Sequence, residues 1–522
     1  ESACRHRLSV VAHCERCESV EQWAGAIQEL ARDAREPDIE QARAEHERWW
    51  RDFWDRSFID ITGDADADAI TRAYQLQRYV TACAGRGLFP IKFNGSIFNV
   101  TGPPQVSKKD RSQQHTYNAD YRTWGGGYWF QNTRLIYWPL LAAGDWEMMR
   151  PWFDLFEHAA TLCRHRCREQ LGKEGLFFPE TMMMWGLYRN KDYGYERPGD
   201  FQAGLTLNCY IRRYWQGGLE LSTLMLDYLA HTGDERWWRE QGYPIVRDVV
   251  RFYHDYYQKR DESGRVVFEP SQSLETWHTA TNPAPDIAGL EHVLKRLMAL
   301  PDALIDAKDR TMFDGFLDAL PPVPVERYDE HHTGRLVPAE RYDDLKNMEN
   351  GELYPVFPYP QGALGGSLHA QASNAWPIRR MRNVCGWMQD AVHAAMLGRA
   401  EEAAQMLIAA LVPEDQADPR VKWRWLLKPQ HPKIRFPGFF GPNFDWVPDQ
   451  DHGCVHMLAL QKMCLQTQHG KLRILPAWPK HWNVHFRLHA PDQTTVETVY
   501  RNGTLETVDV FPMERRNDVI SD

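Results

Sequence analysis

The segment LSTLMLDYLAHTGDERWWREQGYPIVRDVVRFYHDYY, residues 221–257, predicts an apolar helix, a tight turn that contains Gly233, and a second, amphipathic helix. The same order returns in YWPLLAAGDWEMMRPWFDLFEHA (137–159) and in DAVHAAMLGRAEEAAQMLIAAL (390–411). Gly144 and Gly398 occupy the place of Gly233 in these repeats. Repeated helical hairpins that each bury one face against a neighbour are typical of a helical array, open or closed into a ring. Loops that gather at one end of such a ring form a concave surface where binding residues usually collect.

The two ends of the chain have a different character. Residues 20–56 have the charged, helical periodicity of an exposed linker helix, and the run RHRLSVVAHC (5–14) predicts the last strand of a preceding β domain. Since the first residue is Glu1 and not Met, we expect a processed or truncated chain. After residue 470, alternating Val and Thr and an Asn-Gly turn at 502–503 predict a small β domain.

We therefore divide the chain into three predicted parts. These are the end of an N-terminal β domain with a helical linker (1–56), a helical array that is open or closed into a barrel (57–470) and a small C-terminal β domain (471–522). Within the helical array, the segment 301–346 predicts a short helix followed by a long loop.

Composition excludes several classes of partner. Charged residues make up 25% of the 522 residues and are interleaved, with a net charge of −10, which argues against nucleic acid. No run approaches the roughly 18 apolar residues of a membrane span.

The ten cysteines are too sparse for a disulfide scaffold. Neither Cys14 with Cys17 nor Cys163 with Cys167 and His165 completes a zinc site, so we expect no metal and no cofactor. The 21 Trp residues mostly fill the core, but their excess near loop motifs favours a carbohydrate cleft.

The first candidate catalytic acid is Glu275 in FEPSQSLETWH (268–278). It follows a Pro-Ser-x-Ser turn and precedes Trp277, and burial of a loop carboxylate against an aromatic face raises its pKa toward that of a general acid. A surface or helix-capping role remains the alternative, and Glu269 in the same loop is a rival.

The second candidate is Asp451 in FDWVPDQDHGCVHMLALQKMCLQ (444–466), where three acids precede a long apolar helix. One of the three is explained by helix capping. On local grounds Asp445 and Asp449 remain rivals of Asp451.

Asn132, in YWFQNTRLIYWP (128–139), is an amide in a strongly aromatic segment. Buried amides need partners, and a reactive water or its activating carboxylate is one such partner, a structural hydrogen bond another. Two further runs, NMENGELYPVFPY (347–359) and GWMQDAVHAAM (386–396), combine polar and aromatic residues at helix entrances. Glu352 and Asp390 are therefore alternative acids, although core or helix-capping roles are more common for such residues. We expect the following residues to contact substrate: Trp129, Phe130, Trp277, His278, Asn350, Glu352, Trp387, Asp390, Trp446 and His452.

Taken in order, these motifs resemble the α-L-fucosidases of glycoside hydrolase family 95 over roughly residues 40 to 512. The resemblance is carried by the following runs: YWP (137–139), TGD (232–234), PSQSLE (270–275), LPPVPV (320–325), GWMQD (386–390) and ILPAWPKHW (474–482). It implies an (α/α)6 barrel between a preceding β-sandwich with its linker and a following small β domain, and a secreted or periplasmic location.

The resemblance also assigns roles. Glu275 matches the proton donor of the family's Ser-Pro-Glu motif, with Leu274 in place of the proline, and Asp451 matches the acid of its Asp-Gly-Asn-Phe-Gly motif, counted back from MCLQTQHGKLRILPAWPK (463–480). Asn132 matches the second asparagine of Asn-x-Asn, which helps the base orient water, whereas Phe130 replaces the first. This replacement favours a relative that acts on a different sugar.

The resulting hypothesis is an inverting, exo-acting glycosidase in which Glu275 protonates the leaving oxygen and Asp451, assisted by Asn132, activates water. A phosphorylase on the same barrel is one alternative, for which Lys433 and Arg435 are the nearby basic residues. A carbohydrate-binding protein that has lost catalysis is another, suggested by Phe130 and Leu274. The sequence leaves the sugar and the oligomeric state open.

Overall fold

The computed structural model describes residues 8–13, 15, 17–34, 38–94, 97, 105–106, 114–115, 124–327, 334–382, 387–411, 438–439 and 449–521. The chain divides into two compact units, Glu1–Phe58 and Ile59–Asp522.

The first unit is helical where it is described. It contains α1 (Val20–Asp33) and α2 (Ile39–Arg56), whose N-cap residues Ser19 and Asp38 each accept a hydrogen bond from a backbone N–H of the first turn. These helices confirm the prediction for residues 20–56. Residues 8–13, part of the run predicted as a strand, have no regular structure, and the strand of a preceding β domain stays a prediction.

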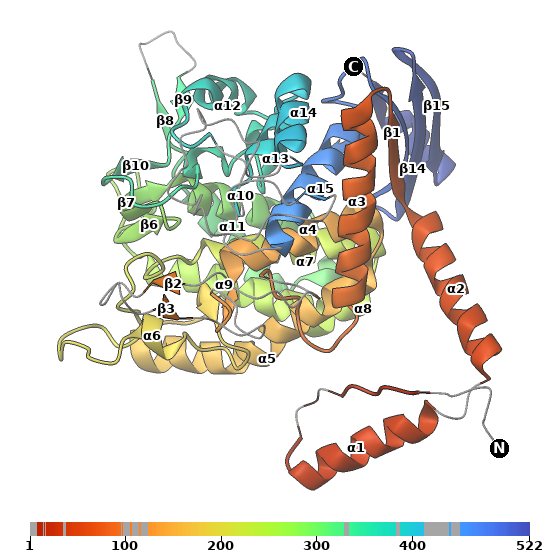
Figure 1. Cartoon of the computed structure of the whole chain (residues 1–522). Coiled ribbons are helices and arrows are strands. Elements are labelled where there is room, and N and C mark those ends of the chain that lie inside the picture. Colours follow the sequence, from red (N-terminus) through yellow and green to blue (C-terminus); the bar gives the residue numbers. More distant parts are fainter. Residues whose placement is uncertain are drawn as a thin grey trace. The chain divides into compact units, whose positions relative to one another are not determined.

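The second unit is mainly helical (Figure 1). Its α-helices are α3 (Ala65–Ala84), α4 (Phe130–Ala143), α5 (Arg150–Arg166), α6 (Asn190–Tyr193), α7 (Gln216–Thr232), α8 (Glu235–Trp237), α9 (Tyr243–Tyr256), α10 (Ala284–Met298), α11 (Ala307–Asp318), α12 (His369–Ala375), α13 (Asp390–Met396), α14 (Ala400–Ala409) and α15 (Gln450–Cys464). Gly144, Gly233 and Gly398 each follow a helix with φ near +70°, so the three equivalent glycines terminate helices as the repeat predicted. Among the described helices, none is long and apolar enough to cross a membrane.

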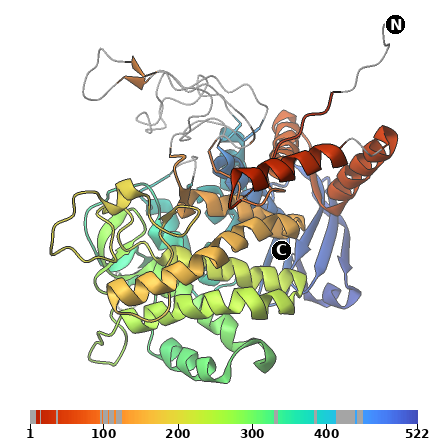
Figure 2. The ribbon, with the colours of Figure 1, turned by 90° about the horizontal axis from the view of Figure 1, so that it is seen from below.

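The helices form an inner and an outer layer. Nearly every residue of α4, α7 and α15 is buried, whereas α5 and α9 bury only one face. The buried helices follow one another around the centre: α15 packs on α4, α4 on α7 and α7 on α10, while α13 packs on α15. Figure 2 shows α4, α5, α7 and α9, coloured orange to yellow-green, lying side by side. The predicted helical barrel with a small β domain is thereby confirmed.

The C-terminal β region consists of two sheets. One has the strand order β1 (Phe58–Thr62), β13 (Asn483–Ala490), β14 (Thr494–Arg501), β15 (Thr504–Phe511), and Figure 1 shows these strands beside α3. The other pairs β11 (Leu465–Gln468), β12 (Lys471–Ile474) and β16 (Val519–Ser521). The strands of this region thus begin at Leu465, six residues before the predicted boundary at 471. Strand β1, which lies in the segment predicted to belong to the barrel, also joins the first sheet.

Further short strands lie between the helices of the second unit along the chain. These are β2 (Gln105–Val106), β3 (Gln114–His115), β4 (Tyr128–Trp129), β5 (Thr181–Met182), β6 (Ser271–Ser273), β7 (Trp277–Pro283), β8 (Val325–Glu326), β9 (Arg335–Leu336) and β10 (Ala339–Tyr342). The segment 301–346 therefore contains α11, as predicted, and then three strands where a loop was expected. Strands of two to four residues are too short to leave a periodic pattern in the sequence.

Candidate active site

Helix α4 carries three polar side chains into the centre of the barrel. Its first turn is fixed by Glu180, whose carbonyl accepts from Phe130 N at 2.8 Å and whose Oε1 accepts from Gln131 N at 3.1 Å. Burial raises the pKa of Glu180 to about 7. Because the helix is almost entirely buried, Gln131, Asn132 and Arg134 must find polar partners inside the protein.

Asn132 contacts Asp451. Its Nδ2 donates to Asp451 Oδ2 at 2.6 Å, and Asp451 Oδ1 accepts from the backbone N–H of His452 at 2.9 Å. Asp451 lies in the first turn of α15 and is fully buried. Of its two rivals, Asp449 occupies the N-cap position of α15, and Asp445 lies outside the described residues. The structure therefore joins Asp451, rather than Asp449, to the amide that the sequence singled out.

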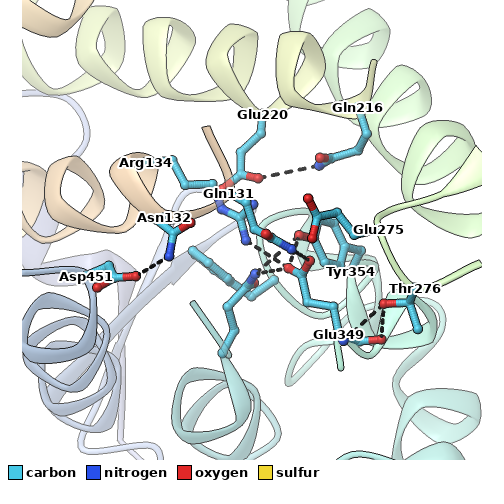
Figure 3. A network of polar contacts seen from close by, with 12 residues as sticks. Gln131, Asn132, Arg134, Gln216, Glu220, Glu275, Thr276, Glu349, Tyr354 and Asp451 are labelled. Carbon is cyan, nitrogen blue, oxygen red and sulfur yellow. Dashed lines mark hydrogen bonds and ion pairs between the residues drawn. The ribbon is translucent and has the colours of Figure 1, made fainter. Parts of the chain in front are cut away.

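Arg134 and Gln131 organise a second, larger polar network (Figure 3). The fully buried guanidinium of Arg134 pairs with Glu220 and with Glu349, each at 3.0 Å. Gln131 Nε2 donates to the other oxygen of Glu349 at 2.6 Å, and the Tyr354 hydroxyl also donates to this carboxylate at 2.6 Å. Pairing of this kind is what a buried guanidinium and two buried carboxylates require.

Glu275 lies at the turn of the β6–β7 hairpin, immediately after Leu274, which has a φ of +55°. Its side chain is 6% exposed, and its Oε2 accepts from Asn347 Nδ2 at 2.6 Å. His278 contacts the carbonyl of Glu275 through Nε2 at 3.1 Å. The rival Glu269 pairs instead with Lys259 and Arg341 near the surface. The expected loop position of Glu275 is confirmed, and its catalytic role stays a prediction.

The predicted residues of the 347–359 and 386–396 runs form a neighbouring cluster. Asn350 Nδ2 donates to Asp390 Oδ1 at 2.9 Å, and Arg379 Nε donates to Asp390 Oδ2 at 3.0 Å. Glu352 is buried beside them, its Oε2 has no hydrogen-bond partner among the described residues, and burial raises its pKa to about 7. Asn350 and Arg379 thus both donate to the carboxylate at the start of α13, and the contact of Asn350, Glu352 and Asp390 with substrate stays a prediction.

The predicted aromatic residues take different positions. Phe130 packs against Trp152 and Phe156 of α5, and its ring also fills the space beside Gly217 of α7. Phe130 therefore takes part in the helix packing, and its contact with substrate stays a prediction. Asn132 is its second neighbour along α4, so the two side chains leave the helix in different directions.

The other aromatic candidates are buried near the polar network. Trp129 donates through Nε1 to the carbonyl of Trp124 at 3.0 Å. The indole N–H groups of Trp277 and Trp387 are buried without a partner among the described residues. His452 is fully buried beside His456, and burial holds its pKa well below the usual value. Trp446, Lys433 and Arg435 lie outside the described residues.

The residue that sequence reasoning missed is Glu349. It lies between Asn347 and Asn350, in a run already quoted for its polar residues, yet its partners on α4 are more than 200 positions away. The available signal was the polar pair Gln131 and Arg134 in an otherwise apolar helix, which demands a buried acceptor.

Comparisons with known sequences and structures identify the family to which the chain belongs. A family model for the "Glycosyl hydrolase family 95 catalytic domain" matches residues 38–420, and one for a "Domain of unknown function (DUF5703)" matches residues 1–59. No curated protein sequence matches.

Solved structures align with most of the chain. A "Putative kojibiose phosphorylase from human microbiome" aligns with a TM-score of 0.54 and 10% identity, over 92% of this chain and 68% of that one, and shares its fold. A glycosidase in which one glutamate is replaced by alanine aligns with a TM-score of 0.38 and 14% identity, over 75% of this chain and 97% of that one. Because the family model spans well over half of the sequence, this chain belongs to glycosyl hydrolase family 95, a family of carbohydrate-active enzymes.

Proposed function

We propose that the protein is an inverting, exo-acting glycoside hydrolase that removes a terminal sugar, L-fucose or a related sugar, from oligosaccharides or polysaccharides. The observation that carries the proposal is the hydrogen bond from the Asn132 amide to the buried carboxylate of Asp451. An amide that orients a buried carboxylate is what a general base for water needs.

Asp451 takes the base role in this mechanism. Its carboxylate is held in one plane by two hydrogen-bond donors from different elements. These are the side chain of Asn132 on α4 and the backbone N–H of His452 on α15. As water attacks the anomeric carbon, Asp451 accepts the proton that the water loses, and the new carbon–oxygen bond forms on the face opposite the leaving group.

Glu275 takes the acid role. It gives its proton to the glycosidic oxygen as the bond from this oxygen to the anomeric carbon breaks, and the proton on Asp451 then returns to solvent while Glu275 is reprotonated. Asn347 holds its carboxyl group in place. An inverting reaction requires a separation of roughly 6.5–9.5 Å between the two carboxyl groups, so that sugar and water fit between them.

The test uses a panel of aryl glycosides and oligosaccharides, with NMR reading the anomer that is released first. Glu275→Gln is expected to abolish cleavage of unactivated glycosides and to spare aryl glycosides with highly activated leaving groups, which need little protonation. Asp451→Asn is expected to impair both classes. Equal losses on both classes in Glu275→Gln, or release of the retained anomer, would contradict the proposal.

Two control arms separate the proposal from its alternatives. Turnover that requires inorganic phosphate and yields a sugar phosphate would identify a phosphorylase. Calorimetric binding of oligosaccharides without release of any product would identify a carbohydrate-binding protein that has lost catalysis.

A further inference from the structure

The segment Asn347–Glu349 contacts the turn that carries Glu275 at two points. Asn347 Nδ2 donates to Glu275 Oε2 at 2.6 Å. The hydroxyl of Thr276, the next residue of the turn, accepts from Glu349 N at 3.0 Å and donates to Glu349 O at 3.1 Å. The backbone of Glu349 is thus fastened to the residue that follows the proposed acid (Figure 3).

The side chain of Glu349 extends from this turn to helix α4. Its Oε2 accepts from Gln131 Nε2 at 2.6 Å, and its Oε1 accepts from Arg134 Nη2 at 3.0 Å. Gln131 is the chain neighbour of Asn132, which holds the proposed base Asp451. One buried side chain therefore connects the hairpin of the acid with the helix that orients the base.

Two side chains outside the hairpin and α4 also donate hydrogen bonds to Glu349. Tyr354 and Gln389 donate to the same oxygen as Arg134, at 2.6 Å and 3.2 Å, and the side chain is only 3% exposed. A carboxylate whose partners are all donors, one of them a guanidinium, acts as an acceptor and has no proton to give to a leaving group. Glu349 can therefore contribute to catalysis only by positioning other residues.

We propose that Glu349 is a positioning residue that sets the separation of Glu275 from the Asn132–Asp451 pair. The inference rests on the proposed function, since an inverting reaction depends on the distance between its two carboxyl groups. A displacement of 1 Å costs roughly a hundredfold in rate when reacting groups must be aligned. Glu349→Gln keeps one acceptor oxygen but removes the charge that pairs with Arg134, so either Gln131 or Arg134 loses its hydrogen bond to this side chain and the link between α4 and the turn weakens.

The test is a double-mutant cycle of Glu349→Gln and Glu275→Gln, measured with the dinitrophenyl and methyl glycosides of the sugar that the aryl-glycoside panel identifies. Glu349→Gln alone is expected to lower kcat roughly a hundredfold with little change in KM, and more for the methyl than for the dinitrophenyl glycoside. In the Glu275→Gln background, Glu349→Gln should lower kcat on the dinitrophenyl glycoside by a markedly smaller factor than it does in the wild type. The reason is that residues that act as a unit give non-additive losses of rate. Losses that multiply would overturn the proposal.

A matched control is Asp309→Asn. Asp309 is also a buried carboxylate that accepts from a tyrosine, Tyr243 at 2.7 Å, and an arginine, Arg251 at 2.6 Å, but it lies on α11. This variant is expected to lower the melting temperature without altering the ratio of rates on the two glycosides. The same change of ratio in Asp309→Asn would show that the effect of Glu349 is general destabilisation, which overturns the proposal.

Thr276→Val provides a second route if Glu349→Gln does not fold. It keeps the shape of the side chain and removes the hydroxyl that holds Glu349, so we expect a loss of kcat of about tenfold with the same dependence on leaving group. An unchanged rate overturns the inference. If Glu275→Gln itself retains full activity on the methyl glycoside, the acid assignment fails and the inference fails with it. If Glu275→Gln behaves as proposed and the losses multiply, only the positioning role fails.

Discussion

The Asn132 amide donates to Asp451 Oδ2 at 2.6 Å across two helices whose residues lie 319 positions apart. Both side chains are buried, so this hydrogen bond forms in surroundings where an electrostatic interaction is stronger than in water. Because Phe130 packs into the helix layer, Asn132 is the only member of the Asn-x-Asn pattern in α4 that contacts Asp451 among the described residues. In the proposed mechanism, the orientation of Asp451 therefore depends on one amide from this helix instead of two.

Asn132→Ala should lower kcat about ten- to a hundredfold. A hydrogen bond to a charged group contributes about 1.5–3 kcal/mol, and each 1.36 kcal/mol corresponds to a factor of ten in rate. Steady-state kinetics on an aryl glycoside measures the change. Gln461→Met is a matched control, since Gln461 is a buried amide of α15 that donates to Tyr74 and to the Pro139 carbonyl. A similar loss of kcat in both variants would show that Asn132 acts only through stability.

Arg134→Met should lower the free energy of unfolding by about 3–5 kcal/mol. The substitution leaves Glu220 and Glu349 buried without their shared cation, and removal of one partner of a buried ion pair carries a cost of this size. Urea denaturation at neutral pH measures it. Arg236→Met, which breaks an exposed pair with Glu240, should change the stability by about 0.5 kcal/mol at most. Equal effects would mean that the buried network contributes no more than a surface pair.

Local sequence patterns predicted the helices well and the site only in part. The Gly144, Gly233 and Gly398 repeat marked real helix ends because a residue with positive φ after a helix favours glycine, a rule that acts within one turn. The position of Glu275 outside a helix followed from its Pro-Ser-x-Ser context. These are properties of neighbours in the chain.

Contacts between distant segments could not be predicted from such patterns. Asp451 was separated from Asp445 and Asp449 by the family resemblance and not by local chemistry. Glu349 was missed because its role is defined by Gln131 and Arg134, which approach it only in the folded barrel. The packing of Phe130 against Trp152 and Phe156 was not predictable either, because an aromatic residue beside a polar amide looks the same in the sequence whether it faces a cleft or the core.

The helix-terminating glycines offer a graded stability test. Gly172 and Gly398 have φ values of +63° and +73°, but a Cβ at Gly172 would meet no atom within 4 Å, whereas one at Gly398 would lie 3.0 Å from Leu364 Cδ1. Gly172→Ala should therefore cost about 1 kcal/mol from the left-handed backbone alone, and Gly398→Ala should cost more. Thermal denaturation ranks the two. A smaller loss for Gly398→Ala would show that Leu364 moves aside without penalty.

Glu352 should make the stability of the protein depend on pH. Burial raises its folded-state pKa to about 7, above the value of about 4.3 for an unfolded glutamate. Between these two values the folded protein keeps a proton that the unfolded chain has released, so the contribution to stability is complete below about pH 4.3, falls as the pH rises, and is lost above about pH 7.

Glu352→Gln removes this titration, so the stability of the variant relative to the wild type should rise from pH 5 to pH 8 by up to about 3 kcal/mol. Urea denaturation at pH 5, 6, 7 and 8 provides the measurement. Burial also raises the pKa values of Glu180 and Asp286 to about 7, but these groups are common to both proteins and cancel in the difference. Glu235→Gln, a substitution on the exposed face of α8, is the control and should give a curve parallel to the wild type. A parallel curve for Glu352→Gln would mean that water or a neighbouring group stabilises the ionised form of Glu352 as well as solvent does.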